Sequence, residues 1–106
     1  GIYAASKAAM TSLTRTMAAE WAPKGIRVNG YSPGVIETEM TKPAIQNNGE
    51  NMLDAIALHH FGKVDEMVKV VGFLASEDSE YITGINLDAS GGKYIVQNAG
   101  NAWKEK

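Results

Sequence analysis

The chain has 106 residues, enough for one small domain, of which 44% are hydrophobic and 21% are charged, as in ordinary soluble globular proteins. The formal net charge is −2 with no run of Lys and Arg, and no apolar stretch approaches the length of a membrane span, so we expect neither a nucleic-acid nor a membrane partner. Cysteine is absent, which excludes disulfides, zinc–thiolate sites and cysteine nucleophiles in these residues and is compatible with the reducing cytoplasm, where we expect the protein.

The first predicted element is a helix over residues 2–22. Apolar residues recur along it at every fourth position, namely Ala5, Ala9, Leu13 and Met17. Further apolar residues cover a second side, which predicts a helix packed on two sides. Pro23 and Gly25 predict its end, because the residue before a proline disfavours helical geometry and glycine readily takes the left-handed conformation. No capping residue precedes the helix, so we expect the chain to begin inside a structural element.

A strand is predicted over residues 26–32 from its β-branched residues, and Ser32-Pro33-Gly34 predicts the turn that ends it. The segment 35–63 predicts a mobile flap. Its polar stretch 46–51 is rich in turn residues, and residues 52–58 predict a short amphipathic helix.

The second half of the chain predicts a helix over 65–75, capped by Asp65, and a strand over 82–89, while the tail 93–106 has no clear pattern. Helix, strand, flap, helix and strand in this order predict an α/β fold whose two strands, joined through a helix, pair in parallel. Two parallel strands do not form a stable sheet alone, so we expect more of the sheet in an upstream segment or in another chain.

Tyr3 and Lys7 are the strongest candidates for catalysis. Four residues apart on a helix, they lie on one face about one turn apart. A nearby ammonium favours the phenolate form of a tyrosine, and a helix N-terminus acts in the same direction, so such a phenol exchanges a proton more readily. The spacing alone is common by chance, and a packed tyrosine beside a solvated lysine is the structural alternative.

The surrounding sequence resembles the short-chain dehydrogenase/reductase family along nearly all of residues 1–92. The resemblance lies in an ordered set of motifs: YAASKAA before a helix, RVN, PGVIETEM, a helix ending FLAS, ITG and GG. It implies that residues 1–106 are the C-terminal half of a single Rossmann domain, an α/β fold with a doubly wound parallel sheet, in which 35–63 is the substrate flap. It also implies an oxidoreductase that transfers a hydride between NAD or NADP and a small carbonyl or secondary-alcohol substrate.

In that family the tyrosine of Y-x-x-x-K is the general acid/base that acts on the substrate oxygen, a role that the resemblance assigns to Tyr3. The lysine holds the nicotinamide ribose hydroxyls and favours the tyrosine phenolate, which the resemblance assigns to Lys7. Both residues would therefore also touch the cofactor. Ser6 lies beside this pair but does not match the family's catalytic serine, which precedes the tyrosine by more residues than the chain has.

The turn Pro33-Gly34 matches the family's turn at the nicotinamide end of the cofactor, and ligands bind beyond the carboxyl ends of parallel strands. Gly34 would permit close backbone approach, and Pro33 would stiffen the turn. By resemblance, the backbone at Ile36 would contact the nicotinamide carboxamide, and the Thr38 hydroxyl the carboxamide or the pyrophosphate. The family also implies a homo-oligomer, a dimer or a homotetramer, in which the helix 2–22 packs against its symmetry mate.

Other polar residues have simpler interpretations. The adjacent His59 and His60 would point apart on a regular helix, so we expect no metal site. Glu37 and Glu39 resemble a carboxylate pair for acid/base work, but we interpret them as solvated loop charges.

The glycine-rich dinucleotide loop and the catalytic serine of the family have no counterpart in the sequence. We therefore expect the upstream half of the domain to be required, and the chain alone to be inactive and unable to bind the cofactor. A hypothesis from a different class is a non-catalytic fragment that acts in assembly or scaffolding through the helix 2–22.

Overall fold

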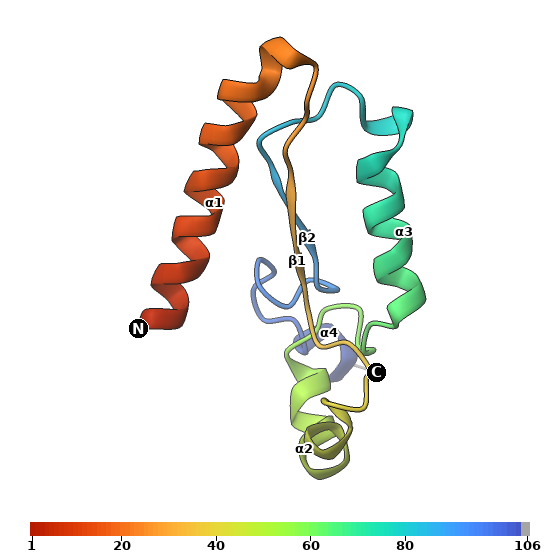
Figure 1. Ribbon diagram of the computed structural model, residues 1–106. Helices are drawn as coiled ribbons and strands as arrows, with labels where there is room; N and C mark the ends of the chain where they lie inside the picture. The colour runs from red at the N-terminus through yellow and green to blue at the C-terminus, as the bar shows by residue number, and fades with distance from the viewer. Residues whose placement is uncertain (105–106) are drawn as a thin grey trace. The chain divides into compact units, whose positions relative to one another are not determined.

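The computed structural model describes residues 1–104 (Figure 1). Its elements in chain order are the helix α1 (Ile2–Trp21), the strand β1 (Gly30–Pro33), the helices α2 (Lys42–Asp54) and α3 (Val64–Ala75), the strand β2 (Asn86–Ala89) and the short helix α4 (Asn101–Lys104). Turns of 3-10 helix over Ala22–Lys24 and Glu77–Ser79 follow α1 and α3.

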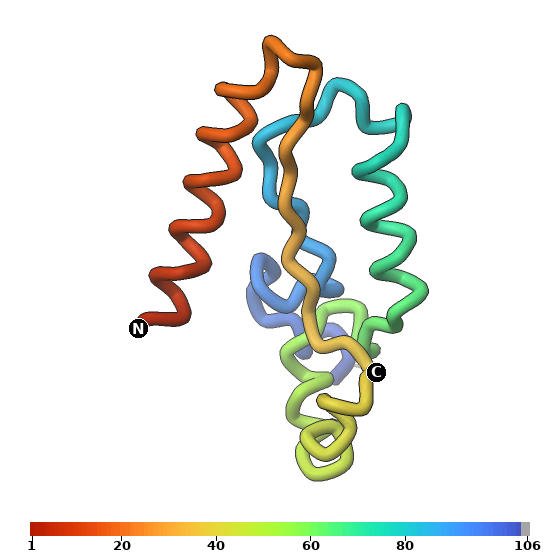
Figure 2. The backbone as a smooth tube through the Cα atoms, in the orientation of Figure 1, coloured from red at the N-terminus to blue at the C-terminus, as the bar shows by residue number. Residues whose placement is uncertain are grey.

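The chain divides into two compact units. The first contains Gly1–Tyr31 and Val71–Leu87, and the second contains Ser32–Val70 and the segment from Asp88 onward. Figure 2 shows the path of the backbone, which passes from α1 into β1 and, much later, from α3 into β2. Tyr3 and Lys7 belong to the first unit, whereas the turn after β1 belongs to the second.

The two strands form a parallel pair. Where they approach each other, the Gly84 N–H donates to the Val28 carbonyl over 2.8 Å and the Gly30 N–H donates to the Ile85 carbonyl over 2.9 Å, so the pairing advances in the same direction along both segments. A connection that contains α2 and α3 joins β1 to β2, as parallel pairing requires. The predicted α/β class with parallel strands is confirmed.

Both strands are shorter than the predicted ranges 26–32 and 82–89, because side chains replace part of the backbone ladder. The Asn29 amide donates to the Ile82 carbonyl over 3.0 Å and accepts from the Ile85 N–H over 3.2 Å. The Val28 N–H donates to the Thr83 hydroxyl instead of to a carbonyl. These bonds satisfy backbone groups without regular strand geometry, so regular pairing begins only at Gly30.

The helix α1 ends as the sequence predicts. Gly25 takes a left-handed φ of 74°, and its N–H donates to the Ala22 carbonyl over 2.9 Å. Only Ala18 is buried along α1, facing Gly84, where its small side chain allows the loop to approach. Large apolar side chains on the rest of the helix are exposed: Ile2, Tyr3, Met10, Leu13 and Trp21. Little of the apolar surface of α1 is therefore covered by the other described residues.

The segment predicted as a polar, turn-rich part of the flap is helical, so the expected irregularity over 46–51 is wrong, and the helix expected over 52–58 begins earlier, at Lys42, and ends at Asp54. The helix α2 runs through this segment with a kink at Asn48, whose φ and ψ are −143° and 22°. The Asn51 amide donates to the Asn48 side-chain oxygen over 2.8 Å at the kink. Half-buried residues at helical spacing on one side of α2 explain why it forms: Ile45, Gly49, Met52 and Leu53.

The helix α3 starts one residue earlier than predicted, and its capping residue is not Asp65. The Glu66 carboxylate accepts from the Lys63 N–H over 3.0 Å, as in the second half of a capping box. At the other end, the Arg27 guanidinium donates to three carbonyls, including that of Leu74 over 2.9 Å. A cation at the C-terminal end of a helix satisfies free carbonyls and complements the helix dipole.

Few apolar side chains are buried. Among residues 1–104 they are Ala18, Ile56 and Phe61, and Ile56 is the most enclosed at 1% exposure. Among the described residues, no helix is both long and apolar enough to cross a membrane.

Candidate functional site

Tyr3 and Lys7 lie together on the first two turns of α1. The Lys7 Nζ is 5.7 Å from the centroid of the Tyr3 ring, within the range of a cation–π contact. The Tyr3 side chain is 73% exposed, so its hydroxyl is accessible to a ligand. The helix thus presents an exposed phenol with an ammonium beside its ring.

Ser6 does not add a third polar group to this pair. Its hydroxyl donates to the Tyr3 carbonyl over 2.8 Å, so its proton is used inside the helix. Thr11 behaves in the same way toward the Lys7 carbonyl, at 3.2 Å. On these first turns of α1, the Tyr3 hydroxyl and the Lys7 ammonium therefore remain as the groups that can meet a ligand.

Gly34 is required by the packing of the second unit. A Cβ atom on Gly34 would lie 2.9 Å from the Ser90 Cα and 3.0 Å from the Ser90 carbonyl oxygen. Ser90 is itself buried, and its hydroxyl and N–H both bond the Asp88 carboxylate, so its backbone has little freedom to move. The sequence predicted a close backbone approach at Gly34. In the structure, the group that approaches Gly34 is Ser90.

Gly34→Ala should therefore disturb the loop after β1. We expect the substitution to lower the free energy of unfolding by about 1–3 kcal/mol, because a methyl group would meet backbone atoms that cannot turn away. Urea denaturation of the complete protein that carries this chain measures the loss. Gly72→Ala is the matched control, because a Cβ atom there meets no heavy atom within 4 Å. Equal stabilities of the two variants would contradict the packing argument.

The backbone of Ile36 is placed by a parallel bridge to Gly62. The Gly62 N–H donates to the Val35 carbonyl over 2.9 Å, and the Glu37 N–H donates to the Gly62 carbonyl over 2.8 Å. In such a bridge the peptide groups of the residue between the two bonded ones point to the opposite side. The Ile36 N–H and carbonyl therefore face away from Gly62.

Thr38 and Thr41 cap each other. The Thr38 N–H donates to the Thr41 hydroxyl over 2.9 Å, and the Thr41 N–H donates to the Thr38 hydroxyl over 3.3 Å. The Thr41 hydroxyl donates its own proton to the Ile36 carbonyl over 2.6 Å. This network fixes the loop between β1 and α2. The Thr38 hydroxyl lies on its exposed side, where it can also meet a ligand.

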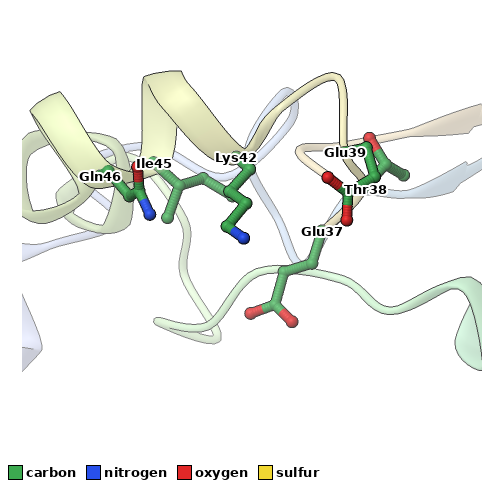
Figure 3. Close-up of a pocket in the computed structure, with 6 residues that line it drawn as sticks. All are labelled: Glu37, Thr38, Glu39, Lys42, Ile45 and Gln46. Carbon is green, nitrogen blue, oxygen red and sulfur yellow. The ribbon is translucent and has the colours of Figure 1, made fainter.

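An open pocket of about 340 Å³ lies beside this loop. Its lining residues come from the loop and from the first turns of α2, as Figure 3 shows: Glu37, Thr38, Glu39, Lys42, Ile45 and Gln46. Glu37 and Glu39 are exposed and line this pocket.

His59 and His60 do not act as a pair. His59 has a left-handed φ of 58° and stacks on the Trp103 indole with ring centroids 4.7 Å apart. The His60 Nδ1 lies 3.0 Å from the Phe61 carbonyl. Within residues 1–104, no three His, Cys, Asp or Glu side chains gather where they could hold a metal ion.

Sequence reasoning missed two residues near this region. Thr41 could have been found from the Thr-x-x-Thr spacing, which is that of a reciprocal cap. Trp103 had no such signal, because its partners Ala57 and His59 lie more than forty positions away in the sequence.

Known proteins match most of the chain. The sequence model of the family described as enoyl-(acyl carrier protein) reductase matches residues 1–93. The 3-oxoacyl-[acyl-carrier-protein] reductase of Thermotoga maritima is 45% identical over 93 residues, which are 88% of this chain and 38% of that protein. The chain thus spans well under half the length of the curated relatives it matches.

Solved structures give the same result. A 4-hydroxyisoleucine dehydrogenase mutant complexed with NADH and succinate superposes with a TM-score of 0.82 at 37% identity, over 91% of this chain and 40% of that one. A blue fluorescent protein from a metagenomic library, in complex with NADPH, superposes with a TM-score of 0.80 at 36% identity, over 88% of this chain and 37% of that one. The ordered motifs, the parallel strand pair and these matches agree: the chain belongs to the short-chain dehydrogenase/reductase family.

Proposed function

We propose that the protein carrying this chain is an NAD- or NADP-dependent oxidoreductase that interconverts a carbonyl and a secondary alcohol, with Tyr3 and Lys7 as its catalytic pair. The observation that carries the proposal is the placement of the Lys7 ammonium 5.7 Å from the centroid of the exposed Tyr3 ring. The relatives support the reaction type, because they are named as reductases and dehydrogenases.

In the direction of reduction, the carbonyl oxygen gains charge and Tyr3 donates its hydroxyl proton to that oxygen. Lys7 stabilises the phenolate that remains on Tyr3. In the direction of oxidation, the Tyr3 phenolate takes the proton from the alcohol. A nicotinamide cofactor, when bound, supplies or accepts the hydride at the substrate carbon.

The loop after β1 fits the nicotinamide end of such a cofactor. A carboxamide oxygen needs a donor, and the Ile36 N–H faces away from the bridge to Gly62, while the Ile36 carbonyl already accepts from the Thr41 hydroxyl. The Thr38 hydroxyl offers a further polar contact, and Pro33 and Gly34 hold the start of the loop. Lys7 would hold the nicotinamide ribose. Solved relatives with NADH and with NADPH support both cofactors equally.

We propose that the complete cofactor site needs sequence beyond residues 1–106. Pyrophosphates in Rossmann folds lie on a glycine-rich turn and a helix N-terminus, and no G-x-G pair occurs in this chain. Residues 1–106 alone should then bind neither NAD nor NADP measurably.

We also propose a homo-oligomer, a dimer or tetramer, assembled through α1. The exposed apolar side chains on this helix supply the surface, and Met10 and Leu13 are 61% and 49% exposed. Sedimentation velocity at micromolar concentration tests this proposal, and a monomer would contradict it. The alternative, a purely scaffolding fragment, uses the same surface but leaves the Tyr3–Lys7 pair without a role.

The test of the proposed function is an activity assay on the complete protein. Purified protein is mixed with NADH or NADPH and a panel of small ketones and 3-oxoacyl thioesters, and the loss of the reduced cofactor is followed by absorbance. We expect turnover with at least one carbonyl class, and loss of this turnover in Tyr3→Phe. Turnover that survives in Tyr3→Phe would refute the role of the catalytic pair.

A further inference from the structure

The tail of the chain lies outside the segment that the family shares, because the family match ends at residue 93. It is nevertheless docked. The Trp103 Nε1–H donates to the Ala57 carbonyl over 2.9 Å, and the Trp103 indole stacks on the His59 ring with 19° between the planes. The short helix α4, which carries Trp103, thus contacts the segment that follows α2 (Figure 1).

The backbone of the tail approaches the same segment closely. Gly100 is buried, and a Cβ atom there would lie 2.8 Å from the Asp54 carbonyl oxygen at the end of α2. The Trp103 N–H donates to the Gly100 carbonyl over 3.2 Å, which turns the tail so that the indole reaches Ala57. We call Gly100–Trp103, docked on Asp54–His59, the tail latch.

The receiving side is held in an unusual conformation. His59 has a left-handed φ of 58°, which residues with a Cβ rarely adopt. Its N–H donates to the carbonyl of Ile56, a buried residue, over 2.9 Å. The stacked indole covers the ring of His59 in this conformation, so the latch stabilises the tight turn after α2.

The position of this turn gives the latch a functional consequence. The first turns of α2 line the pocket next to Thr38, and the turn after α2 leads to Gly62, which bridges Ile36. The latch therefore fixes the C-terminal end of α2. The N-terminal end of the same helix lies at the pocket beside the loop of the proposed nicotinamide site.

From these contacts we infer that Trp103 is a positioning residue that holds α2 in place and thereby sets the affinity for the substrate. This inference rests on the proposed function, because it treats α2 as a wall of the substrate pocket. A latch that fixes α2 changes substrate binding more than the chemical step, since the reacting groups lie on α1.

The experiment compares Trp103→Leu, Trp103→Phe and Tyr94→Leu in the complete protein. Leucine removes both the stack and the N–H donor, whereas phenylalanine keeps an aromatic ring and removes only the donor. Tyr94→Leu is the matched control, because Tyr94 is an exposed aromatic residue of the same tail whose ring contacts the Lys93 ammonium.

Hydrogen exchange gives the readout that is independent of activity. In Trp103→Leu we expect amides of residues 50–58 to exchange at least about tenfold faster than in the wild type, with a smaller effect in Trp103→Phe and none in Tyr94→Leu. Unchanged exchange in Trp103→Leu would overturn the latch. This measurement needs no substrate. It therefore tests the latch even if the proposed enzymatic function proves wrong.

Steady-state kinetics give the second readout. In Trp103→Leu we expect KM for the carbonyl substrate to rise about fivefold to tenfold, with kcat changed by less than about twofold. Trp103→Phe should recover part of the loss, and Tyr94→Leu should match the wild type. Faster exchange with an unchanged KM would show that the latch is only structural and would overturn the inference.

Discussion

Tyr3→Phe in the complete protein is expected to lower kcat by about 10²- to 10⁴-fold while the affinity for the nicotinamide cofactor stays close to the wild-type value. The substitution removes one hydroxyl group and keeps the ring, so the ring and the Lys7 ammonium 5.7 Å from its centroid can retain their contact. What is lost is the proton that the hydroxyl exchanges with the substrate oxygen. The expected loss therefore falls on the chemical step.

The measurement separates the two effects. Single-turnover or steady-state assays give kcat, and titration calorimetry gives the dissociation constant of the cofactor. Tyr81→Phe is the matched control, because the Tyr81 side chain is fully exposed and lies after α3, far along the chain from the catalytic helix. Tyr81→Phe should keep full turnover. A Tyr3→Phe protein with near-normal kcat would refute Tyr3 as the general acid/base.

The sequence predicts those parts of the fold that depend on local patterns. The apolar repeat of α1 and the Pro23–Gly25 stop lie within a few residues of one another, and the helix ends there. The parallel pairing of β1 and β2 follows from the helix between them. In both cases the decisive interactions are close in the sequence or follow from connectivity.

The ends of the strands could not be predicted, because the bonds that shorten them join residues more than fifty positions apart. Asn29 reaches Ile82 and Ile85 through its side-chain amide. Asparagine in a sequence marks a weak strand position, but it does not reveal which carbonyl its amide will meet.

The helix α2 shows how packing overrides intrinsic preference. Asn47, Asn48 and Gly49 favour turns, yet the helix continues through them with a kink. The half-buried row on one face of α2 and the hydrogen bond from Asn51 to Asn48 stabilise the helix against these local preferences. A period-3.6 count from Ile45 to Leu53 in the sequence was the signal that could have found it.

In the candidate site, too, local spacing could be predicted from the sequence and tertiary contacts could not. Tyr3 and Lys7 could be placed from their spacing, because four residues on a helix fix their separation. Gly34 was expected to matter for backbone approach, but the group that approaches is Ser90, which follows the last strand. The identity of a packing partner is a tertiary fact, and one sequence does not contain it.

Lys7→Met is expected to weaken cofactor binding and turnover together. Methionine is nearly as good a helix former as lysine and is similarly long and unbranched, so α1 should keep its stability. The variant loses the cation beside the Tyr3 ring and the proposed bonds to the nicotinamide ribose. Each hydrogen bond to a charged group contributes about 1.5–3 kcal/mol, so the dissociation constant of the cofactor should rise by at least about tenfold.

The turnover of Lys7→Met should fall for a separate reason: no cation remains to stabilise the phenolate of Tyr3. The control is Lys24→Met, which removes an exposed lysine of the turn after α1 and should change neither constant. Lys7→Arg keeps the charge but presents it as a planar fork, so it should recover part of the turnover and less of the ribose binding. Titration calorimetry and steady-state kinetics on the three variants decide the matter. If Lys7→Met bound the cofactor as tightly as Lys24→Met does, Lys7 would have no part in holding the ribose.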